Sequence, residues 1–213
     1  MIGSCGFLNP MLFFSPLQFG FRRGLSSVDA LFRLETNIRE GFVNREHTIC
    51  VFFDLEKAYD TTWRYGILQD LHVLGLRGNL PLFVQNFLSS RSFQVRLGSM
   101  YSTPFIQQNG VPQGSVLSCT LFLVKIDAIL NQLPPSVLGG LNVDDLHISC
   151  SSPRLSFIEH QLNRAILCLC SWADQNDFHF SSSKTGCALF PFTWVVSSTC
   201  PLFTRNPFFR SYF

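Results

Sequence analysis

Apolar residues recur along this chain at two spacings, one typical of helices and one typical of buried strands. Ser26 and Asp29 fit a capping box, and the apolar positions after them predict a helix over about residues 28–42. The apolar stripe of this helix comprises Val28, Leu31, Phe32, Ile38 and Phe42. Residues 48–54 form a nearly continuous apolar run, which predicts a strand buried on both faces.

The rest of the chain alternates helical and extended patterns. Further helices are predicted over about residues 65–74, 80–89, 116–131 and 153–177. Hairpins are predicted over residues 93–106, with a turn at Gly98-Ser99, and over residues 138–150. This pattern indicates an α+β fold in which an antiparallel sheet packs on helices.

Composition supports one main folded domain. The chain has 213 residues, of which 46% are hydrophobic and 14% are charged, so a sizeable core can form. The formal net charge of +2 does not by itself indicate a nucleic-acid partner, which would require the arginines to gather on one face. The candidates for such a face are Arg22, Arg23, Arg33, Arg39, Arg64, Arg91 and Arg96.

Neither secretion nor membrane insertion is indicated. Residues 1–19 are apolar, but they lack a basic leading segment and are interrupted by Pro10 and Pro16. The eight cysteines contain no C-x-x-C pair, so neither a zinc site nor a disulfide framework is predicted. We expect an intracellular protein without a membrane partner.

The candidate chemistry lies in two aspartate clusters. Asp54 ends the apolar run 51–54, and Asp144-Asp145 lie within the β-prone run 141–148, so a sheet could bring both clusters to one rim. Three carboxylates at one rim repel one another, and a divalent cation removes that conflict. Mg²⁺ prefers such hard oxygen ligands, and two ions about 3.5–4 Å apart can assist an in-line phosphoryl displacement. Taken singly, the clusters also fit a strand-end cap and a hairpin turn.

A glycine-bracketed turn lies between the two clusters and precedes the apolar run 121–130. Gly110 and Gly114 permit positive φ and close approach of the backbone to a ligand. Gln113, between them, supplies an amide that can both donate and accept hydrogen bonds.

The order of these segments resembles the reverse transcriptases of non-LTR (LINE-type) retrotransposons, with jockey-like elements of arthropods as the nearest type. F-D-L-E-K-A-Y-D at 53–60, G-V-P-Q-G-S-V-L-S at 110–118 and V-D-D at 143–145 are similar to palm motifs A, B and C. The resemblance implies a polymerase right-hand palm with partial fingers.

Two flanking segments extend this resemblance over about residues 17–190. Q-F-G-F-R-R-G-L-S-S-V-D at 18–29 resembles a fingers segment, and W-A-D-Q-N followed by S-K-T at 183–185 resembles the motif D region. Residues 1–16 and 191–213 do not resemble the family, so we expect an atypical N-terminal segment and an atypical C-terminal tail.

Carried over to matching positions, the resemblance implies a site for two Mg²⁺ ions, with Mn²⁺ as a substitute. Asp54 and Asp144 would ligate both ions. Asp145 would be a third carboxylate with a weaker or outer-sphere role, and the backbone carbonyl of Leu55 would complete one coordination shell.

The resemblance also implies contacts with the substrate. Tyr59 falls at the aromatic gate that excludes a ribose 2′-OH, and Gln113 and Gly114 would pack against the incoming nucleotide and template base. Lys184 matches a proton donor to the leaving pyrophosphate, and Arg22 could meet the triphosphate as a bidentate donor. Plainer interpretations are a core aromatic for Tyr59 and solvated surface cations for Lys184 and Arg22.

The chain departs from the family pattern at several positions. Asn142 stands where the family has an aromatic residue before the aspartates, and Cys119 stands where it has a proline. Asp127 replaces an asparagine and adds a negative charge close to the site. Asp177 replaces a glycine, which predicts a positive-φ turn that aspartate tolerates better than most residues.

The implied reaction is attack of a DNA primer 3′-OH on the α-phosphate of a dNTP, templated by RNA, with release of pyrophosphate. The implied compartment is the nucleus. The alternative is a catalytically inactive retrotransposon remnant that is at most a nucleic-acid-binding module. A metal-dependent glycosyltransferase would also use an acidic motif, but it does not explain G-V-P-Q-G-S.

Overall fold

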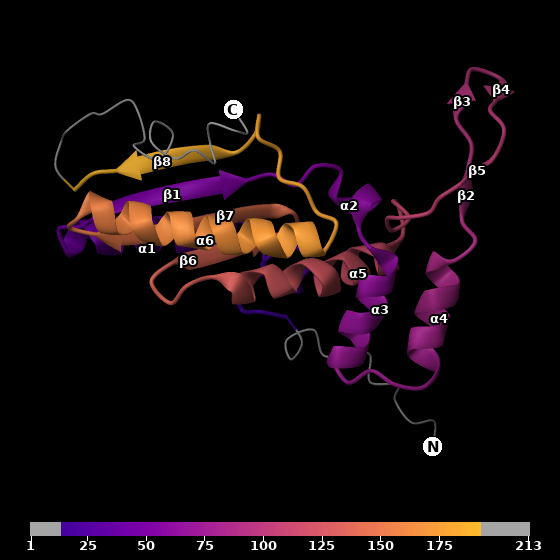
Figure 1. Ribbon diagram of the computed structural model, residues 1–213, viewed down its shortest axis with the longest axis horizontal. Helices are drawn as coiled ribbons and strands as arrows, with labels where there is room; N and C mark the ends of the chain where they lie inside the picture. Colours follow the sequence, from indigo (N-terminus) through magenta and orange to yellow (C-terminus); the bar gives the residue numbers. More distant parts are fainter. Residues whose placement is uncertain (1–13, 193–213) are drawn as a thin grey trace. The chain divides into compact units, whose positions relative to one another are not determined.

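The computed structural model describes residues 14–192, which divide into two compact units (Figure 1). Unit 1 contains the chain up to Glu56 and from Ile126 onward, and unit 2 is Lys57–Lys125. The atypical segments expected at 1–16 and 191–213 lie outside the described residues except for residues 14–16 and 191–192. Within the described range, every helix is too short or too polar to cross a membrane.

Unit 1 is built on a four-stranded antiparallel sheet with the strand order β6-β7-β1-β8. The strands are β1 (His47–Phe53), β6 (Leu138–Asn142), β7 (Asp145–Ser152) and β8 (Gly186–Phe190). The predicted strand at 48–54 and the predicted hairpin at 138–150 are confirmed. Strand β8 was not predicted, and its Cys187 is disulfide-bonded, which the cysteine spacing did not indicate.

The centre of β1 is buried on both faces, as its continuous apolar run predicted. Thr48, Ile49, Cys50 and Val51 are each 0% exposed, although their side chains point alternately to opposite faces of the sheet. The core of unit 1 therefore lies on both sides of this strand.

Helix α1 (Ser27–Val43) confirms the first predicted helix but not its buried face. Its capping box is present, and the Ser26 N–H donates to Asp29 Oδ2 over 2.7 Å. The buried residues are Ala30, Leu34 and Gly41. The residues of the predicted stripe that are instead exposed are Val28, Leu31, Phe32 and Phe42.

The reason for this difference is a close approach between α1 and the sheet. A Cβ on Gly41 would overlap the Thr48 hydroxyl, so the helix meets the strands with its smallest residue. Burial on α1 is therefore set by fit to the sheet and not by hydrophobicity alone.

Helix α6 (Leu155–Gln175) packs on β7 and β1 and confirms the predicted helix at 153–177. The chain leaves α6 through Asp177, whose φ of 59° confirms the expected positive-φ turn. This turn directs Phe178 back into the core, where its ring stacks on Trp172 with centroids 5.7 Å apart.

Unit 2 contains α2 (Ala58–Thr61), α3 (Arg64–Val73), α4 (Asn79–Leu88) and all but the last residue of α5, which spans Val116–Ile126. The predicted helices at 65–74 and 80–89 are confirmed. The helix predicted at 116–131 ends earlier as α-helix, because Asp127–Gln132 continue as the 3-10 helix η2.

The predicted hairpin at 93–106 is confirmed as two short ladders in unit 2. Strand β2 (Ser92–Phe93) pairs with β5 (Phe105–Ile106), and β3 (Arg96–Leu97) pairs with β4 (Met100–Tyr101). The turn between β3 and β4 contains Gly98 with a φ of 62°, a conformation that glycine adopts without steric cost.

Candidate active site

Carboxylates from distant segments meet at one end of the unit 1 sheet. Asp54 directly follows β1, whose last residue Phe53 pairs with Leu146 of β7. Asp145 begins β7 and pairs with Asn142 across the turn that contains Asp144. The predicted convergence of the two aspartate clusters is therefore confirmed.

Burial and repulsion between carboxylates both disfavour the charged form of Asp145 in this cluster. Burial raises the pKa of the Asp145 carboxyl above its ordinary value, and the negative charges of Asp144 and Asp54 raise it further. Lys184 opposes this effect, and its Nζ lies 3.0 Å from Asp54 Oδ2. Because the Lys184 side chain is 67% exposed, water screens this ion pair and the repulsion is only partly relieved.

The donor chemistry of the cluster fits a hard divalent cation. In the described part of the chain, no group of three or more His, Cys, Asp or Glu side chains stands arranged as a metal site. Lys184 offsets the charge of these aspartates only in part, and oxygen-preferring cations neutralise clusters of this kind.

The backbone beside the first aspartate is held by the segment that follows α6. The Ser181 N–H donates to the carbonyl of Asp54 over 2.7 Å, and the Glu56 N–H donates to the carbonyl of His179 over 2.8 Å. Neither bond uses the carbonyl of Leu55, the predicted backbone ligand.

The segment predicted to belong to the fingers supports the aspartate turn. The Leu141 N–H donates to the carbonyl of Leu17 over 2.9 Å, and the Phe19 N–H donates to the carbonyl of Leu141 over 2.8 Å. These bonds create a parallel bridge between Gln18 and Leu141, at the end of the sheet next to the turn. The buried Gln18 side chain accepts from the Val143 N–H through Oε1 over 3.2 Å.

Val143 explains why this turn needs support. It has a φ of 65°, in the left-handed region that is strained for a β-branched residue. Gly20 packs against it so closely that a Cβ would lie 2.5 Å from the Val143 nitrogen. Gln18 and Gly20 are therefore positioning residues that the sequence analysis missed, although a glutamine inside an apolar segment was a signal.

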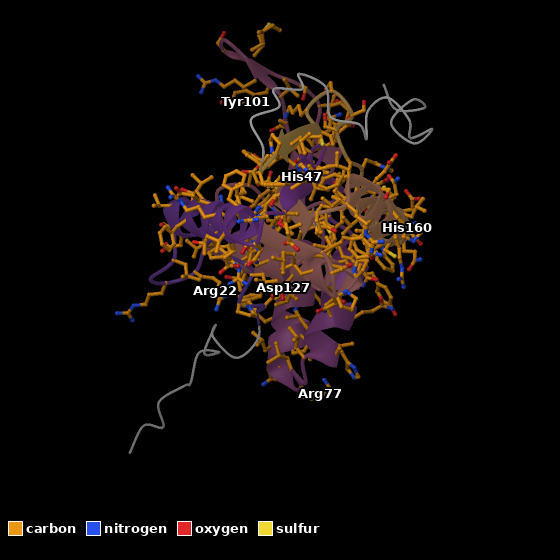
Figure 2. The ribbon with its side chains drawn as sticks, turned by 90° about the vertical axis from the view of Figure 1, so that its left-hand side faces the viewer. Arg22, His47, Arg77, Tyr101, Asp127 and His160 are labelled. Atoms are coloured by element: carbon orange, nitrogen blue, oxygen red, sulfur yellow. The ribbon has the colours of Figure 1, made fainter. Side chains whose placement is uncertain are left out.

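Arg22 and Asp127 lie near one another in unit 1, and both contact the same backbone residue (Figure 2). Arg22 Nη1 donates to the carbonyl of Ser15 over 2.7 Å, and the Ser15 N–H donates to Asp127 Oδ2 over 2.9 Å. Burial raises the pKa of Asp127, and the Arg22 guanidinium partly opposes that effect. Arg22 thus has a structural role here, and its contact with a triphosphate stays a prediction.

In unit 2, the glycine-bracketed turn is bound to the start of the same unit. The Val111 N–H donates to the backbone carbonyl of Tyr59 over 2.8 Å, and the Gly110 N–H donates to the backbone carbonyl of Thr62 over 2.9 Å. A Cβ on Gly110, whose φ is 81°, would lie 2.6 Å from the carbonyl oxygens of both Tyr59 and Asp60. Glycine is required at this position by conformation and by space.

Arg64 organises the same turn, whereas the sequence suggested it only as one candidate for a basic face. Its guanidinium donates to the carbonyls of Gly110 over 2.7 Å, Gln107 over 2.8 Å and Asn109 over 3.2 Å. Burial, followed by the charge of Arg91, lowers the pKa of Arg64. An arginine that follows an aromatic residue at a helix start was the available signal.

The turn brings together the predicted nucleotide-contacting residues of unit 2. Gln113 Nε2 donates to Asp60 Oδ1 over 3.0 Å, next in sequence to Tyr59. The Tyr59 ring stacks on Phe122 with centroids 4.7 Å apart and planes 16° apart. Gly114 has a φ of 89°, and a Cβ there would meet nothing within 4 Å. The structure thus groups Tyr59, Gln113 and Gly114 in unit 2.

Comparison with known proteins shows which family has this order of motifs. The family profile for reverse transcriptase (RNA-dependent DNA polymerase) matches residues 6–200. The probable RNA-directed DNA polymerase from transposon BS of Drosophila melanogaster is 28% identical over 87% of the chain and 21% of its own length. The RNA-directed DNA polymerase from mobile element jockey of the same fly is 28% identical over 89% of the chain and 21% of its own length. The chain thus spans about one fifth of these curated relatives.

Solved structures share the fold. Apo telomerase from Candida tropicalis, truncated from its C-terminal domain, has a TM-score of 0.59 at 12% identity and covers 82% of the chain and 36% of its own. Telomerase from Candida albicans, in complex with a TWJ fragment of telomeric RNA, has a TM-score of 0.59 at 14% identity over 81% of the chain and 32% of its own. The α+β architecture is that of a polymerase palm. With its ordered motifs and a family match over residues 6–200, the chain belongs to the reverse transcriptase family.

Proposed function

We propose that residues 17–190 form the palm and partial fingers of an RNA-directed DNA polymerase from a non-LTR mobile element. The observation that carries this proposal is the meeting of Asp54, Asp144 and Asp145 beside Lys184 at one end of the sheet. The carboxylates come from palm motifs A and C, in which the family concentrates its catalytic acids.

Asp54 and Asp144 would hold two Mg²⁺ ions, with Asp145 and the carbonyl of Leu55 as additional oxygen donors. When bound, such ions lower the pKa of an attacking hydroxyl and stabilise the charge on the leaving oxygen. The raised pKa of Asp145 supports this proposal, because neighbouring carboxylates that repel one another gain most from a cation. Mn²⁺ would substitute for Mg²⁺ at the same oxygens.

The chemical step breaks a phosphoanhydride bond of the dNTP and forms a phosphodiester bond to the primer. The primer 3′-oxygen bonds to the α-phosphorus of the dNTP as the bond from that phosphorus to the bridging oxygen breaks. The 3′-OH proton passes to solvent, and the leaving pyrophosphate takes up a proton, for which Lys184 is the proposed donor. Its ammonium is already held at the catalytic carboxylates by Asp54.

Residues of unit 2 would select the nucleotide. Tyr59 would exclude the ribose 2′-OH, and its stacking on Phe122 fixes the plane of its ring. Gln113 and Gly114 would pack against the incoming nucleotide and the template base. The positive φ of Gly114 and the open space at its Cβ position support a close approach of a ligand to the backbone.

The template would be RNA, the primer DNA and the substrate a dNTP, with the nucleus as the compartment. Primer extension on purified protein, with poly(rA)/oligo(dT), dTTP and Mg²⁺ or Mn²⁺, tests this function. We expect metal-dependent extension that Asp144→Ala abolishes. A folded protein without extension under either metal would contradict the polymerase proposal and favour the inactive remnant, which the comparisons do not favour.

A further inference from the structure

The hairpin arm of unit 2, defined here as residues 91–107, presents an unusual surface. It comprises the ladders β2–β5 and β3–β4, which extend beyond the end of α4 (Figure 1). Large apolar side chains on the arm are between 49% and 84% exposed. They are Phe93, Val95, Leu97, Met100, Tyr101, Phe105 and Ile106. Contiguous apolar exposure of this kind marks an interaction surface.

The charged side chains of the arm are exclusively positive. The sequence contains no Asp or Glu between Asp70 and Asp127, a stretch that includes the whole arm. The arm itself contributes Arg91 and Arg96. The charge of the arm therefore complements an anionic partner.

Aromatic rings and guanidinium groups are interleaved on the arm. The Arg96 guanidinium lies 5.6 Å from the centroid of the Tyr101 ring, which is 61% exposed and is labelled on the arm in Figure 2. Phe93 and Phe105 stack across the β2–β5 ladder with centroids 5.7 Å apart. The arm thus offers flat faces for stacking next to cations for phosphates.

This combination distinguishes between anionic partners. A duplex presents phosphates but keeps its bases stacked inside, so exposed rings would gain little from it. An unpaired strand presents both phosphates and base faces, and proteins that bind such strands combine stacking aromatics with a basic track. An acidic protein surface would match the arginines but would leave the faces of the rings unused.

We propose that the hairpin arm binds single-stranded nucleic acid, with Tyr101 stacking on a base and Arg96 contacting a phosphate. The proposal rests on the proposed function only for the presence of an unpaired template. Because binding requires neither metal nor dNTP, it can be tested apart from polymerisation.

The test is fluorescence anisotropy of the full chain with a labelled oligo(rU) of about 12 nucleotides, without metal or dNTP. We expect Tyr101→Ala to weaken binding roughly tenfold, whereas Tyr101→Phe keeps the ring and binds like the wild type. We expect Arg96→Gln to reduce the slope of log affinity against log salt by about 0.7. Arg154→Gln is the matched control because Arg154 is exposed and precedes α6, outside the arm, so its slope should not change.

Several outcomes would overturn the proposal. They are absence of oligonucleotide binding by the wild type, and equal affinity of wild type and Tyr101→Ala. If Tyr101→Ala keeps full affinity but converts a self-associated protein into monomers by light scattering, the arm is a protein contact surface. Loss of binding in Tyr101→Ala, in a chain that shows no primer extension, would support the arm while contradicting the polymerase proposal.

Discussion

Gly20 occupies a position where only a hydrogen atom fits against Val143. A Cβ at this position would lie 2.5 Å from the Val143 nitrogen and would also overlap its side chain. Val143 precedes Asp144 and holds a φ of 65°, so the glycine and the strained residue together set the conformation of the aspartate turn. Through this packing, the segment that resembles the fingers sets the turn that carries Asp144.

Gly20→Ala tests this relationship. The added methyl group must displace the backbone of Val143, so we expect a loss of unfolding free energy of about 1–3 kcal/mol in urea denaturation. Primer extension should fall as well, because a displacement of about 1 Å at a reacting group can cost roughly 100-fold in rate. Gly186→Ala is the control, since a Cβ there meets nothing within 4 Å and its effect should stay within about 0.5 kcal/mol. Equal effects of the two substitutions would exclude a special role for Gly20.

Substitution of Lys184, which pairs with Asp54, distinguishes a contribution to stability from a contribution to catalysis. We expect Lys184→Gln to change the unfolding free energy by no more than about 0.5 kcal/mol, since solvent screens the pair. If Lys184 donates a proton to pyrophosphate, the same substitution lowers kcat by roughly 100-fold. Lys184→Arg retains the charge but not the ability to lose a proton, so kcat should stay low. Wild-type kcat in Lys184→Arg would argue for charge alone.

Sugar selection should depend on the ring of Tyr59. Tyr59→Ala removes the proposed obstacle to a 2′-OH, so incorporation of ribonucleotides relative to deoxyribonucleotides should increase. Tyr59→Phe keeps the ring that stacks on Phe122 and should keep discrimination. The measurement is the ratio of kcat/KM for dTTP and UTP on one primer and template. An unchanged ratio in Tyr59→Ala would show that Tyr59 is only a core aromatic.

Substitution of Asn142 tests whether this departure from the family pattern limits activity. It pairs with Asp145 in the hairpin and stands where the family has an aromatic ring. We expect Asn142→Tyr to restore packing beside the aspartates and raise primer extension, and Asp144→Ala to abolish extension in both backgrounds. If Asn142→Tyr stays as inactive as Asp144→Ala while both proteins are folded, the inactive remnant is the better description.

Asp127 makes stability depend on pH. Burial raises the pKa of its carboxyl in the folded state, so its favourable contribution is complete below pH 3.8 and is lost as pH rises through the raised pKa. Asp127→Asn removes the charge but keeps an oxygen that can accept from the Ser15 N–H. We expect Asp127→Asn to be more stable than the wild type at pH 7, with the gain shrinking as pH falls toward 3.8. Urea unfolding at both pH values measures this, and a gain independent of pH would contradict it.

Local signals were sufficient for much of the fold. The capping box at Ser26 and Asp29 and the continuous apolar run around Val51 determine structure through neighbours in sequence, so α1 and β1 were predictable. The positive φ at Asp177 was predictable for the same reason. The order of the acidic and glycine-rich motifs indicated that Asp54 and Asp144 would meet.

Features that depend on distant partners were not predictable. The buried face of α1 depends on the fit of Gly41 to Thr48, which no helical period encodes. Strand β8 is a five-residue edge strand whose pairing with β1 gives no periodic signal. The function of Gln18 in holding the aspartate turn depends on a hydrogen bond between residues 125 positions apart.

That separation has a consequence for synthesis of the chain. The ribosome makes Gln18 long before its partner Val143, 125 residues later. At about 5–20 residues per second, this delay is roughly 6–25 seconds. During it, β1 also lacks β7, because Thr48 pairs with Ser151, 103 residues away. The apolar run of β1 therefore stays without its sheet neighbours for much of translation, and an unpaired apolar strand of this kind favours aggregation of the nascent chain.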